Sequence, residues 1–166
     1  MTRPGADWTW FGKAEVDMAL RTCTDLLATK PLSGAFPPVV EQASMCWLLI
    51  NLNDLLQKLD SLGRRVDFTD DIHEACKAAD VTALINNARN AACHLNSSNH
   101  LHEANKLSFN VARGYVPRML VINDVVFGCD YADDAAVMFG SNIVYLRRHL
   151  ERAHNAAELI VRELAL

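Results

Sequence analysis

Apolar residues recur at three- and four-residue spacing over two long stretches near the start of the chain, and this periodicity limits the chain to a fold built around helices. The first stretch covers residues 11–29 and ends just before Pro31. The second covers residues 39–62 and is apolar around much of its circumference between residues 47 and 59, as expected for a helix at the centre of a bundle. Gly63 follows this second stretch and suits a helix C-cap.

The length of 166 residues is enough for one compact domain with a buried core, so we expect a single domain over residues 1–166. Of these residues, 51% are hydrophobic and 22% are charged, which is the balance of a globular protein. No apolar run approaches the roughly 20 residues of a membrane-spanning helix, and the N-terminus lacks the features of a secretory signal. We therefore expect a cytoplasmic protein that makes no membrane contact. Its five cysteines include no Cys-x-x-Cys pair and indicate neither a disulfide framework nor a zinc knuckle.

The middle of the chain predicts a connection followed by a third helix. Residues 64–79 form the connection, with a short helix capped by Asp70 or Asp71. Asp80 then caps the third helix, which we place over residues 81–95. This third helix carries the residues from which a function can be predicted.

The C-terminal part of the chain changes character. Residues 106–139 contain short β-branched and aromatic runs separated by turn residues, which we interpret as a small antiparallel ribbon. A last helix is predicted from Ser141 to the C-terminus. The predicted fold class is therefore mainly α: an up-and-down helical bundle with a small antiparallel β-ribbon inserted before the last helix.

The third predicted helix has a polar face that needs an explanation. At about 100° per residue, Asn86, Asn90 and His94 stack on neighbouring turns of one face, and Arg89 lies at its border. Asparagine is a poor helix former, whereas a face that meets only water is usually built from Lys and Glu. We infer that this face meets another polar surface, such as a second copy of the same helix. An ordinary exposed helix end, where the charge of His94 suits the helix dipole, is the alternative.

Residues 89–94, with the sequence Arg-Asn-Ala-Ala-Cys-His, resemble the signature of HEPN domains. In that signature an Arg is followed by a polar residue and, four to six positions after the Arg, by a His on a helix late in an α-helical bundle. The order of the predicted helices resembles the family too, and the ribbon would be an insertion. The Tyr that some toxin members carry two places after the His is replaced here by Asn96, so regulation through modification of that Tyr is not expected.

The resemblance implies metal-independent RNA cleavage, or in some members a non-catalytic scaffold, within toxin–antitoxin, phage-defence or stress systems. In such a site His94 would take the proton of a ribose 2′-hydroxyl and return one to the leaving oxygen. Arg89 would hold the phosphate and stabilise its developing charge, and Asn90 would orient the imidazole or the phosphate. No metal or cofactor is implied. The implied partners are RNA, a second copy of the chain, and an antitoxin or regulatory protein.

A homodimer follows from the same residues, because positions five apart on a helix point about 140° from each other. Pairing through the asparagine face, with Asn86 as a supporting residue, would bring Arg89 and His94 of both copies into one cleft. Asn51 and Asp54 share a face of the second helix and are candidates to reach the motif helix and fix Arg89. A polar patch at the helix end or a core hydrogen bond is the alternative for these two residues.

The net charge of −4 argues against a protein that coats nucleic acid non-specifically, and it favours the rival function of a dimeric interaction or RNA-binding module that cleaves nothing. Five arginines are available to form a local basic groove: Arg113, Arg118, Arg147, Arg148 and Arg152. A further group has metal-ligating side chains but lacks the His spacing of a zinc protease: His94, His100, His102 and Glu103. Asp133-Asp134 predicts a turn.

Overall fold

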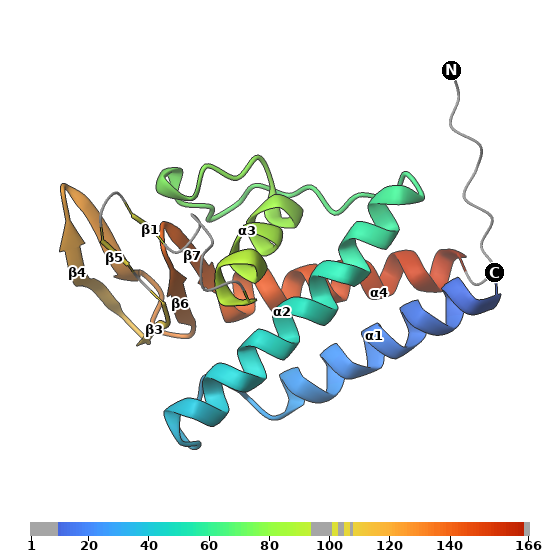
Figure 1. Ribbon diagram of the computed structural model, residues 1–166, viewed down its shortest axis with the longest axis horizontal. Helices are drawn as coiled ribbons and strands as arrows, with labels where there is room; N and C mark the ends of the chain where they lie inside the picture. Colours follow the sequence, from blue (N-terminus) through green and yellow to red (C-terminus); the bar gives the residue numbers. More distant parts are fainter. Residues whose placement is uncertain (1–9, 94–100, 103–104, 107, 165–166) are drawn as a thin grey trace.

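The computed structural model describes residues 10–93, 101–102, 105–106 and 108–164. Within these residues the chain forms four α-helices, with an antiparallel sheet region at one end of the molecule (Figure 1). The helices are α1 (Trp10–Ala28), α2 (Pro38–Ser61), α3 (Val81–Cys93) and α4 (Arg152–Leu164). The long helices α1 and α2 pack against each other and against α4, and α3 packs across α2 on the side nearer the sheet.

The two long N-terminal helices lie close to the predicted ranges, so both predictions are confirmed. Helix α2 supplies much of the core through one buried side: Met45, Leu48, Leu49, Leu52, Leu55, Leu56 and Leu59. Gly63 ends α2 with a φ of +74°, a conformation that favours glycine. Its N–H donates to the carbonyl of Asp60 at 2.9 Å, and the N–H of Arg64 donates to that of Leu59 at 2.9 Å. This pair of bonds is a Schellman motif, and it confirms the predicted C-cap.

The connection after α2 contains a single 3₁₀ turn, η1 (Glu74–Cys76). Its N-cap is His73, whose Nδ1 accepts a hydrogen bond from the N–H of Ala75 at 3.1 Å. The prediction that Asp70 or Asp71 caps this turn is therefore wrong. Both carboxylates are instead used at longer range, since Asp70 accepts from Arg152 and Asp71 from the Tyr131 hydroxyl.

Helix α3 begins as predicted. The Oδ1 of Asp80 accepts the N–H of Ala83 at 2.8 Å, which is an N-cap hydrogen bond. Arg65 holds the same carboxylate through Nε at 2.8 Å and Nη2 at 3.0 Å. Burial alone would raise the pKa of Asp80, but the hydrogen bonds from Arg65 and Ala83 outweigh it and hold that pKa below its usual value. The predicted end of the helix at Leu95 lies outside the described residues.

The sheet region is larger and more buried than predicted. Three strands form one antiparallel sheet in the order β3-β6-β7: β3 (Asn110–Arg113), β6 (Ala135–Phe139) and β7 (Asn142–Tyr145). Two further antiparallel pairs accompany it: β4 (Val116–Ile122) with β5 (Val125–Cys129), and β1 (Leu101–His102) with β2 (Asn105–Lys106). Every residue of β6 and β7 is buried, and both strands contact α3.

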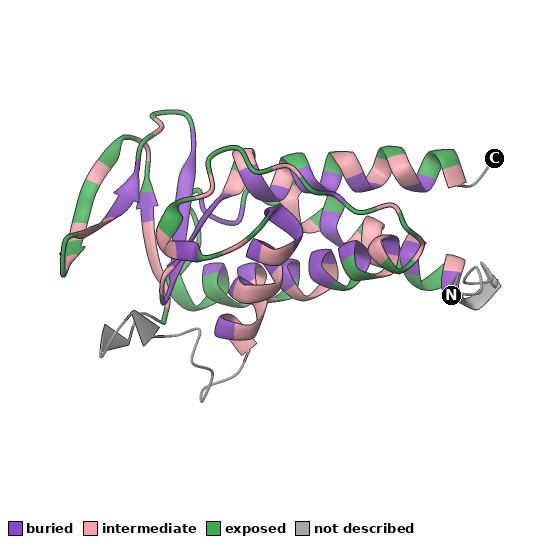
Figure 2. Cartoon of the chain, turned by 90° about the horizontal axis from the view of Figure 1, so that it is seen from above, coloured by how far each residue is buried: buried purple, intermediate pink, exposed green. Residues whose placement is uncertain are grey.

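The prediction of a mainly α, HEPN-like up-and-down bundle with a small ribbon is therefore wrong. The chain has a mixed fold of helices and antiparallel strands, in which the sheet forms part of the core and packs against both α3 and the segment η3 (Leu146–Glu151) that precedes α4. Figure 2 shows how buried residues line the inner sides of the helices and continue into the strands.

The predicted start of the last helix at Ser141 is also wrong. Gly140 and Ser141 form the two-residue turn of the β6–β7 hairpin, in which Phe139 pairs with Asn142. After β7 the chain enters a π-helical segment, η3 (Leu146–Glu151), and α4 follows. A strand buried on both faces has no alternating pattern, so its apolar residues were indistinguishable from those of a buried helix.

None of the helices in the described ranges is both long enough and apolar enough to span a membrane.

Candidate functional site

Helix α3, which carries the predicted motif, lies between α2 and the strand β7. Its core stripe is close to the predicted one and contains Val81, Leu84, Ile85, Ala88 and Ala91. The remaining residues of the 13-residue helix, other than buried Thr82, are half-buried, including Asn86, Asn87 and Asn90. The asparagine face is thus partly shielded from solvent within one copy of the chain.

Helices α2 and α3 run antiparallel, and contacts at both ends fix how they align (Figure 1). At one end the Cys46 thiol lies 4.0 Å from the carbonyl oxygen of Ala92. Burial raises the pKa of this thiol, and the neighbouring Cys93 raises it further. At the other end Arg65 bridges Asp60 in the last turn of α2, at 2.7 Å, and Asp80 at the N-cap of α3. The motif end of α3 therefore lies beside the N-terminal half of α2.

Arg89 is held on this surface by its neighbour in the motif. Its Nη1 donates to Oδ1 of Asn90 at 3.1 Å, and its Nε is buried. The guanidinium is half-buried, on a helix that contains no acidic residue. Two of the three predicted catalytic residues, Arg89 and Asn90, are therefore brought together. The third, His94, directly follows the last described residue of α3 and lies outside the described residues.

The predicted supporting residues on α2 lie elsewhere. Asn51 donates to the carbonyl of Trp47 at 2.8 Å, and Asp54 is exposed. Both line a groove of about 380 Å³ between α1 and α2, together with Glu15, Val16, Met18, Ala19, Leu55 and Lys58. The structure therefore places Asn51 and Asp54 against α1 and does not bring them to Arg89.

Asn53 is a polar residue of α2 that sequence reasoning did not single out. Its side chain is only 6% exposed, and its Nδ2 donates to Oδ1 of Asp54 at 3.2 Å. Its Oδ1 is buried and has no hydrogen bond among the described residues. Asn53 follows Cys46, which contacts α3, by seven residues or two helical turns, and this spacing was the available signal that it lies on a packed side of α2.

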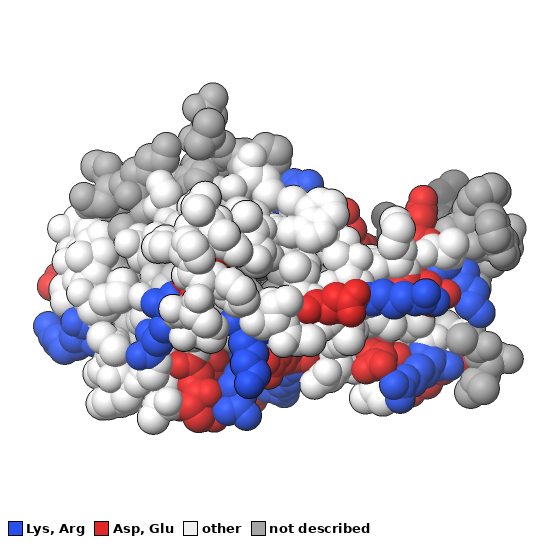
Figure 3. Space-filling view, turned by 90° about the horizontal axis from the view of Figure 1, so that it is seen from below, with Lys and Arg blue, Asp and Glu red and all other residues white. Residues whose placement is uncertain are grey.

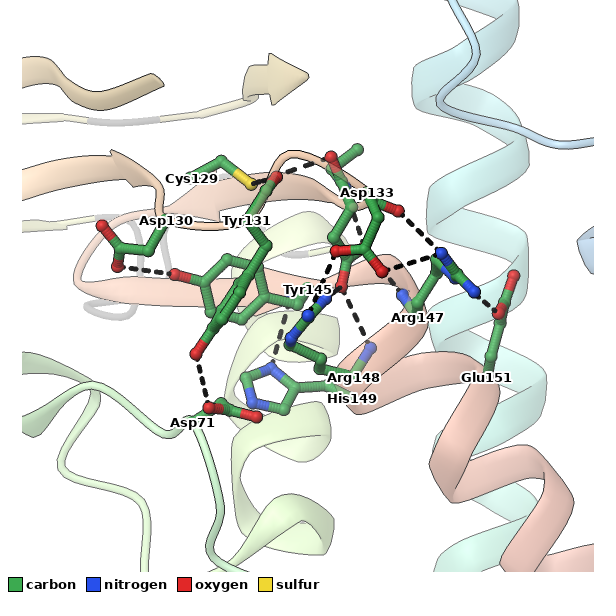
Figure 4. Close-up of polar contacts among 12 residues, drawn as sticks. Asp71, Cys129, Asp130, Tyr131, Asp133, Tyr145, Arg147, Arg148, His149 and Glu151 are labelled. Atoms are coloured by element: carbon green, nitrogen blue, oxygen red, sulfur yellow. Dashed lines mark hydrogen bonds and ion pairs between the residues drawn. The ribbon is translucent and has the colours of Figure 1, made fainter. Parts of the chain in front are cut away.

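The C-terminal arginines, in contrast, are bound to carboxylates (Figure 4). Arg147 lies 2.9 Å from Asp133, and Arg148 lies 3.1 Å from Asp133 and 3.0 Å from Asp134. Arg152 lies 2.9 Å from Asp70. Arg113 on β3 forms an ion pair with the buried Glu41. Because each of these four arginines is paired with a carboxylate, they do not form the local basic groove that the sequence allowed.

Asp134 does more than form the predicted turn. Its side chain is completely buried and accepts the backbone N–H groups of Arg147 at 2.9 Å and Arg148 at 3.1 Å, so it caps η3. The guanidinium of Arg148 also stacks over the ring of Tyr131 at 3.5 Å. π-Helical turns often occur at functional sites, but the polar groups of this one are used to fasten the sheet to α4.

Charges of both signs alternate on the face of the molecule seen in Figure 3. Blue and red side chains lie next to each other there, and this face has no broad basic patch. A phosphate backbone would gain little from such a surface, since non-specific binding relies on an excess of cationic groups.

In the part of the chain that the structure describes, no group of three His, Cys, Asp or Glu side chains is placed to hold a metal ion. The sequence also offered His94, His100, His102 and Glu103 as a metal site. His94, His100 and Glu103 lie outside the described residues, and only the backbone of His102 is described.

Comparison of the chain with protein-family models, with curated proteins and with solved structures gives no match. The resemblance of residues 89–94 to the HEPN signature therefore stays a prediction from the sequence.

Proposed function

We propose that this chain is a metal-independent endoribonuclease of the HEPN kind, with a site built from Arg89, Asn90 and His94. The observation that carries the proposal is the half-buried guanidinium of Arg89, which Asn90 holds through a hydrogen bond of 3.1 Å. An amide acceptor orients a guanidinium without neutralising its charge. Asn90 therefore orients the Arg89 side chain through a neutral acceptor, and a guanidinium is the group best suited to bidentate recognition of a phosphate.

The proposed reaction needs only these side chains. His94 accepts the proton of a ribose 2′-hydroxyl while the 2′-oxygen bonds to the adjacent phosphorus. The bond from phosphorus to the 5′-oxygen of the next nucleotide breaks, and an imidazolium returns a proton to that oxygen. Arg89 stabilises the negative charge that grows on the non-bridging oxygens. The products are a 2′,3′-cyclic phosphate and a free 5′-hydroxyl.

A row of exposed apolar residues on α2 supports the proposed homodimer. Val39 is 71% exposed, Trp47 is 53% exposed, and Ala43 lies exposed between them at four-residue spacing. Val39 and Ala43 lie within about 60° of Cys46 around the helix, and Cys46 contacts α3. Exposed apolar rows of this kind mark protein interfaces. A second copy that packs on this row would lie next to the motif helix.

The proposal is tested with the pure protein, in EDTA, on single-stranded and structured RNA. Wild type should leave 2′,3′-cyclic phosphate ends, and His94→Ala should lower the rate by about 10²-fold or more, the usual contribution of a general base. Arg89→Ala should lower it to a similar extent. Arg21→Ala, which removes an exposed arginine from α1, is the matched control and should cleave like wild type. Cleavage that survives both motif substitutions would come from a contaminant and end the proposal.

The second candidate function is a dimeric RNA-binding or protein-binding module without catalytic activity. It is favoured by the mixed charges of the surface and the net charge of −4, because a free ribonuclease usually carries a basic groove. The same experiment separates the two functions. A wild-type protein that forms a dimer and retains RNA on a native gel, but releases no cyclic phosphate, would be such a module.

A further inference from the structure

Two of the five cysteines are partly accessible to solvent, and these two are neighbours in the fold. Cys46 on α2 and Cys93 at the end of α3 are half-buried. The other three are at most 4% exposed: Cys23, Cys76 and Cys129. A thiol has to be reachable from solvent before it can react with a dissolved oxidant. Cys46 and Cys93 are therefore the thiols that can be oxidised while the protein stays folded.

A contact between α2 and α3 brings these two cysteines together. The Cys46 thiol donates to the carbonyl oxygen of Ala92, with 4.0 Å between sulfur and oxygen. In a trans peptide that oxygen lies about 2.8 Å from the Cα of the next residue, so the sulfur of Cys46 lies within about 7 Å of the Cα of Cys93. The two thiols also interact through space, since the charge of Cys93 raises the pKa of Cys46.

The remaining separation is small enough for a disulfide to close. In a disulfide the sulfur of one cysteine lies roughly 4 Å from the Cα of the other, so the approach still needed is at most about 3 Å. Cys93 is the last residue of α3, and the last turn of a helix has carbonyl groups without intrahelical partners. This end of the helix therefore yields more readily than its middle.

We infer that Cys46 and Cys93 form an internal disulfide when the folded protein meets a peroxide, and that this bond links α2 to the motif end of α3. Disulfides of this reversible kind are typical of redox sensing. The three buried thiols take no part in it.

The reaction consumes one peroxide for each disulfide. The Cys93 thiolate attacks one oxygen of hydrogen peroxide, the O–O bond breaks, and Cys93 becomes a sulfenic acid while the other oxygen leaves as water. The Cys46 thiolate then attacks the Cys93 sulfur, so that the S–S bond forms, the S–O bond breaks and a second water leaves. Both sulfurs are oxidised and both peroxide oxygens are reduced. The first step belongs to Cys93, because burial raises the pKa of Cys46 and lowers its thiolate fraction.

The disulfide acts on the proposed site because Cys93 is part of the motif. Cys93 follows Arg89 by about one helical turn and directly precedes His94. Oxidation also removes the S–H group of Cys46, so the last turn of α3 loses the hydrogen bond to the Ala92 carbonyl. A small displacement of a catalytic group lowers a rate strongly, so the oxidised protein should cleave RNA more slowly. This consequence rests on the proposed function, whereas the disulfide itself does not.

The disulfide is tested by mass spectrometry of the folded protein after treatment with one equivalent of hydrogen peroxide. We expect the wild-type chain to lose the mass of two hydrogen atoms and to regain it in dithiothreitol. Cys46→Ser and Cys93→Ser should not show this loss. Cys23→Ala is the matched control, because it removes a buried thiol and should oxidise like wild type. It also simplifies peptide mapping, since trypsin leaves Cys23 and Cys46 on one peptide.

Three results would overturn the inference: an unchanged mass in the folded wild type, a covalent dimer on a non-reducing gel in place of the internal bond, or a mass loss that persists in Cys93→Ser. If a serine variant does not fold, the cross-linked tryptic peptide of oxidised Cys23→Ala decides which two thiols have paired.

Cleavage gives the second measurement. Oxidised wild type should cleave RNA about tenfold more slowly or less, and Cys93→Ser should keep its rate in peroxide. Equal rates before and after complete disulfide formation would overturn the effect on the site. If untreated wild type does not cleave RNA, the proposed function fails, and the mass measurement still decides whether Cys46 and Cys93 pair.

Discussion

His149 is a completely buried histidine in η3, and its Nδ1 accepts the backbone N–H of Tyr145 at 3.1 Å. Burial lowers the pKa of this imidazole, although the carbonyl group of Asp70 and the charge of Asp71 oppose the shift. The imidazole is therefore neutral in the folded protein and takes up a proton more readily once the chain unfolds. Because the unfolded state binds more protons, folding stability falls as pH drops through the unfolded pKa of about 6.5.

We expect the free energy of unfolding to decrease between pH 7.5 and pH 5.5, with a contribution from His149 of at most about 1.4 kcal/mol per pH unit. His149→Asn keeps an acceptor for the Tyr145 N–H and should flatten this dependence in urea titrations. His73→Asn is the control, because His73 is exposed and makes the same kind of bond to a backbone N–H. An equal slope in His149→Asn and wild type would contradict the prediction.

The polar residues of α2 show which properties of a single residue could be predicted from the sequence and which could not. Helical spacing showed that Asn51 and Asp54 share a face, but not which neighbouring helix that face meets. Positions 51 and 53 differ by about 200° around the helix, so Asn51 lines the groove beside α1 while Asn53 is buried on another side of α2. The choice depends on long-range packing, since α2 is buried on one side and has helices on both flanks.

At the scale of elements, most predictions that rest on local signals are confirmed, although His73 and not Asp70 or Asp71 caps η1. Two long periodic stretches became α1 and α2, Gly63 closes α2, and Asp80 caps α3, because each of these signals acts within one turn of the chain. The sheet was underestimated because β6 and β7 are buried along their whole length. Ile143 continues the helical spacing of Leu146 and Leu150 in η3, and only the pairing of β7 with β6 shows that the chain at Ile143 is a strand.

The cap of η3 gives a prediction at the scale of elements. Asp134→Ala removes the acceptor of three backbone N–H groups, those of Ala135, Arg147 and Arg148, and of the Arg148 guanidinium. Loss of one partner from a buried, hydrogen-bonded ion pair typically costs about 3–5 kcal/mol, so we expect strong destabilisation in chemical denaturation. Asp133→Ala changes the preceding residue, whose carboxylate is exposed, and should leave the unfolding midpoint close to wild type. Similar midpoints for the two variants would show that η3 does not depend on its cap.

At the scale of the whole molecule, the sheet and α2 together determine what α3 can expose. Strand β7 packs on one side of α3 and α2 on another, so that the asparagines of α3 are half-buried, while the N-terminal half of α2 carries the exposed apolar row. A surface that combines exposed Val39 and Trp47 with uncharged amides suits contact with an identical surface, because apolar groups and amides can each pack against their own counterparts across a two-fold axis.

If that surface is the dimer interface, charge placed on the apolar row should separate the copies. We expect Trp47→Glu to weaken dimerisation by at least tenfold in sedimentation velocity, and RNA cleavage to fall with it, because the site needs both copies. Met18→Glu is the control: Met18 is 67% exposed, but it lies on α1 in the groove beside Asn51, so this variant should dimerise like wild type.

A shared site also predicts complementation between two inactive proteins. Arg89→Ala and His94→Ala homodimers should each be inactive, but after mixing and subunit exchange a heterodimer holds one intact Arg89 and one intact His94 at the same two-fold axis. We therefore expect a mixture to regain a measurable fraction of the wild-type cleavage rate, which should rise with the fraction of heterodimer. Two separate sites, each complete within one copy, would stay inactive in every mixture, because neither copy then has both side chains. The regained cleavage should be lost when the His94→Ala copy also carries Trp47→Glu, because that substitution weakens the dimer. Cleavage that persists in this mixture would contradict a site shared between the two copies.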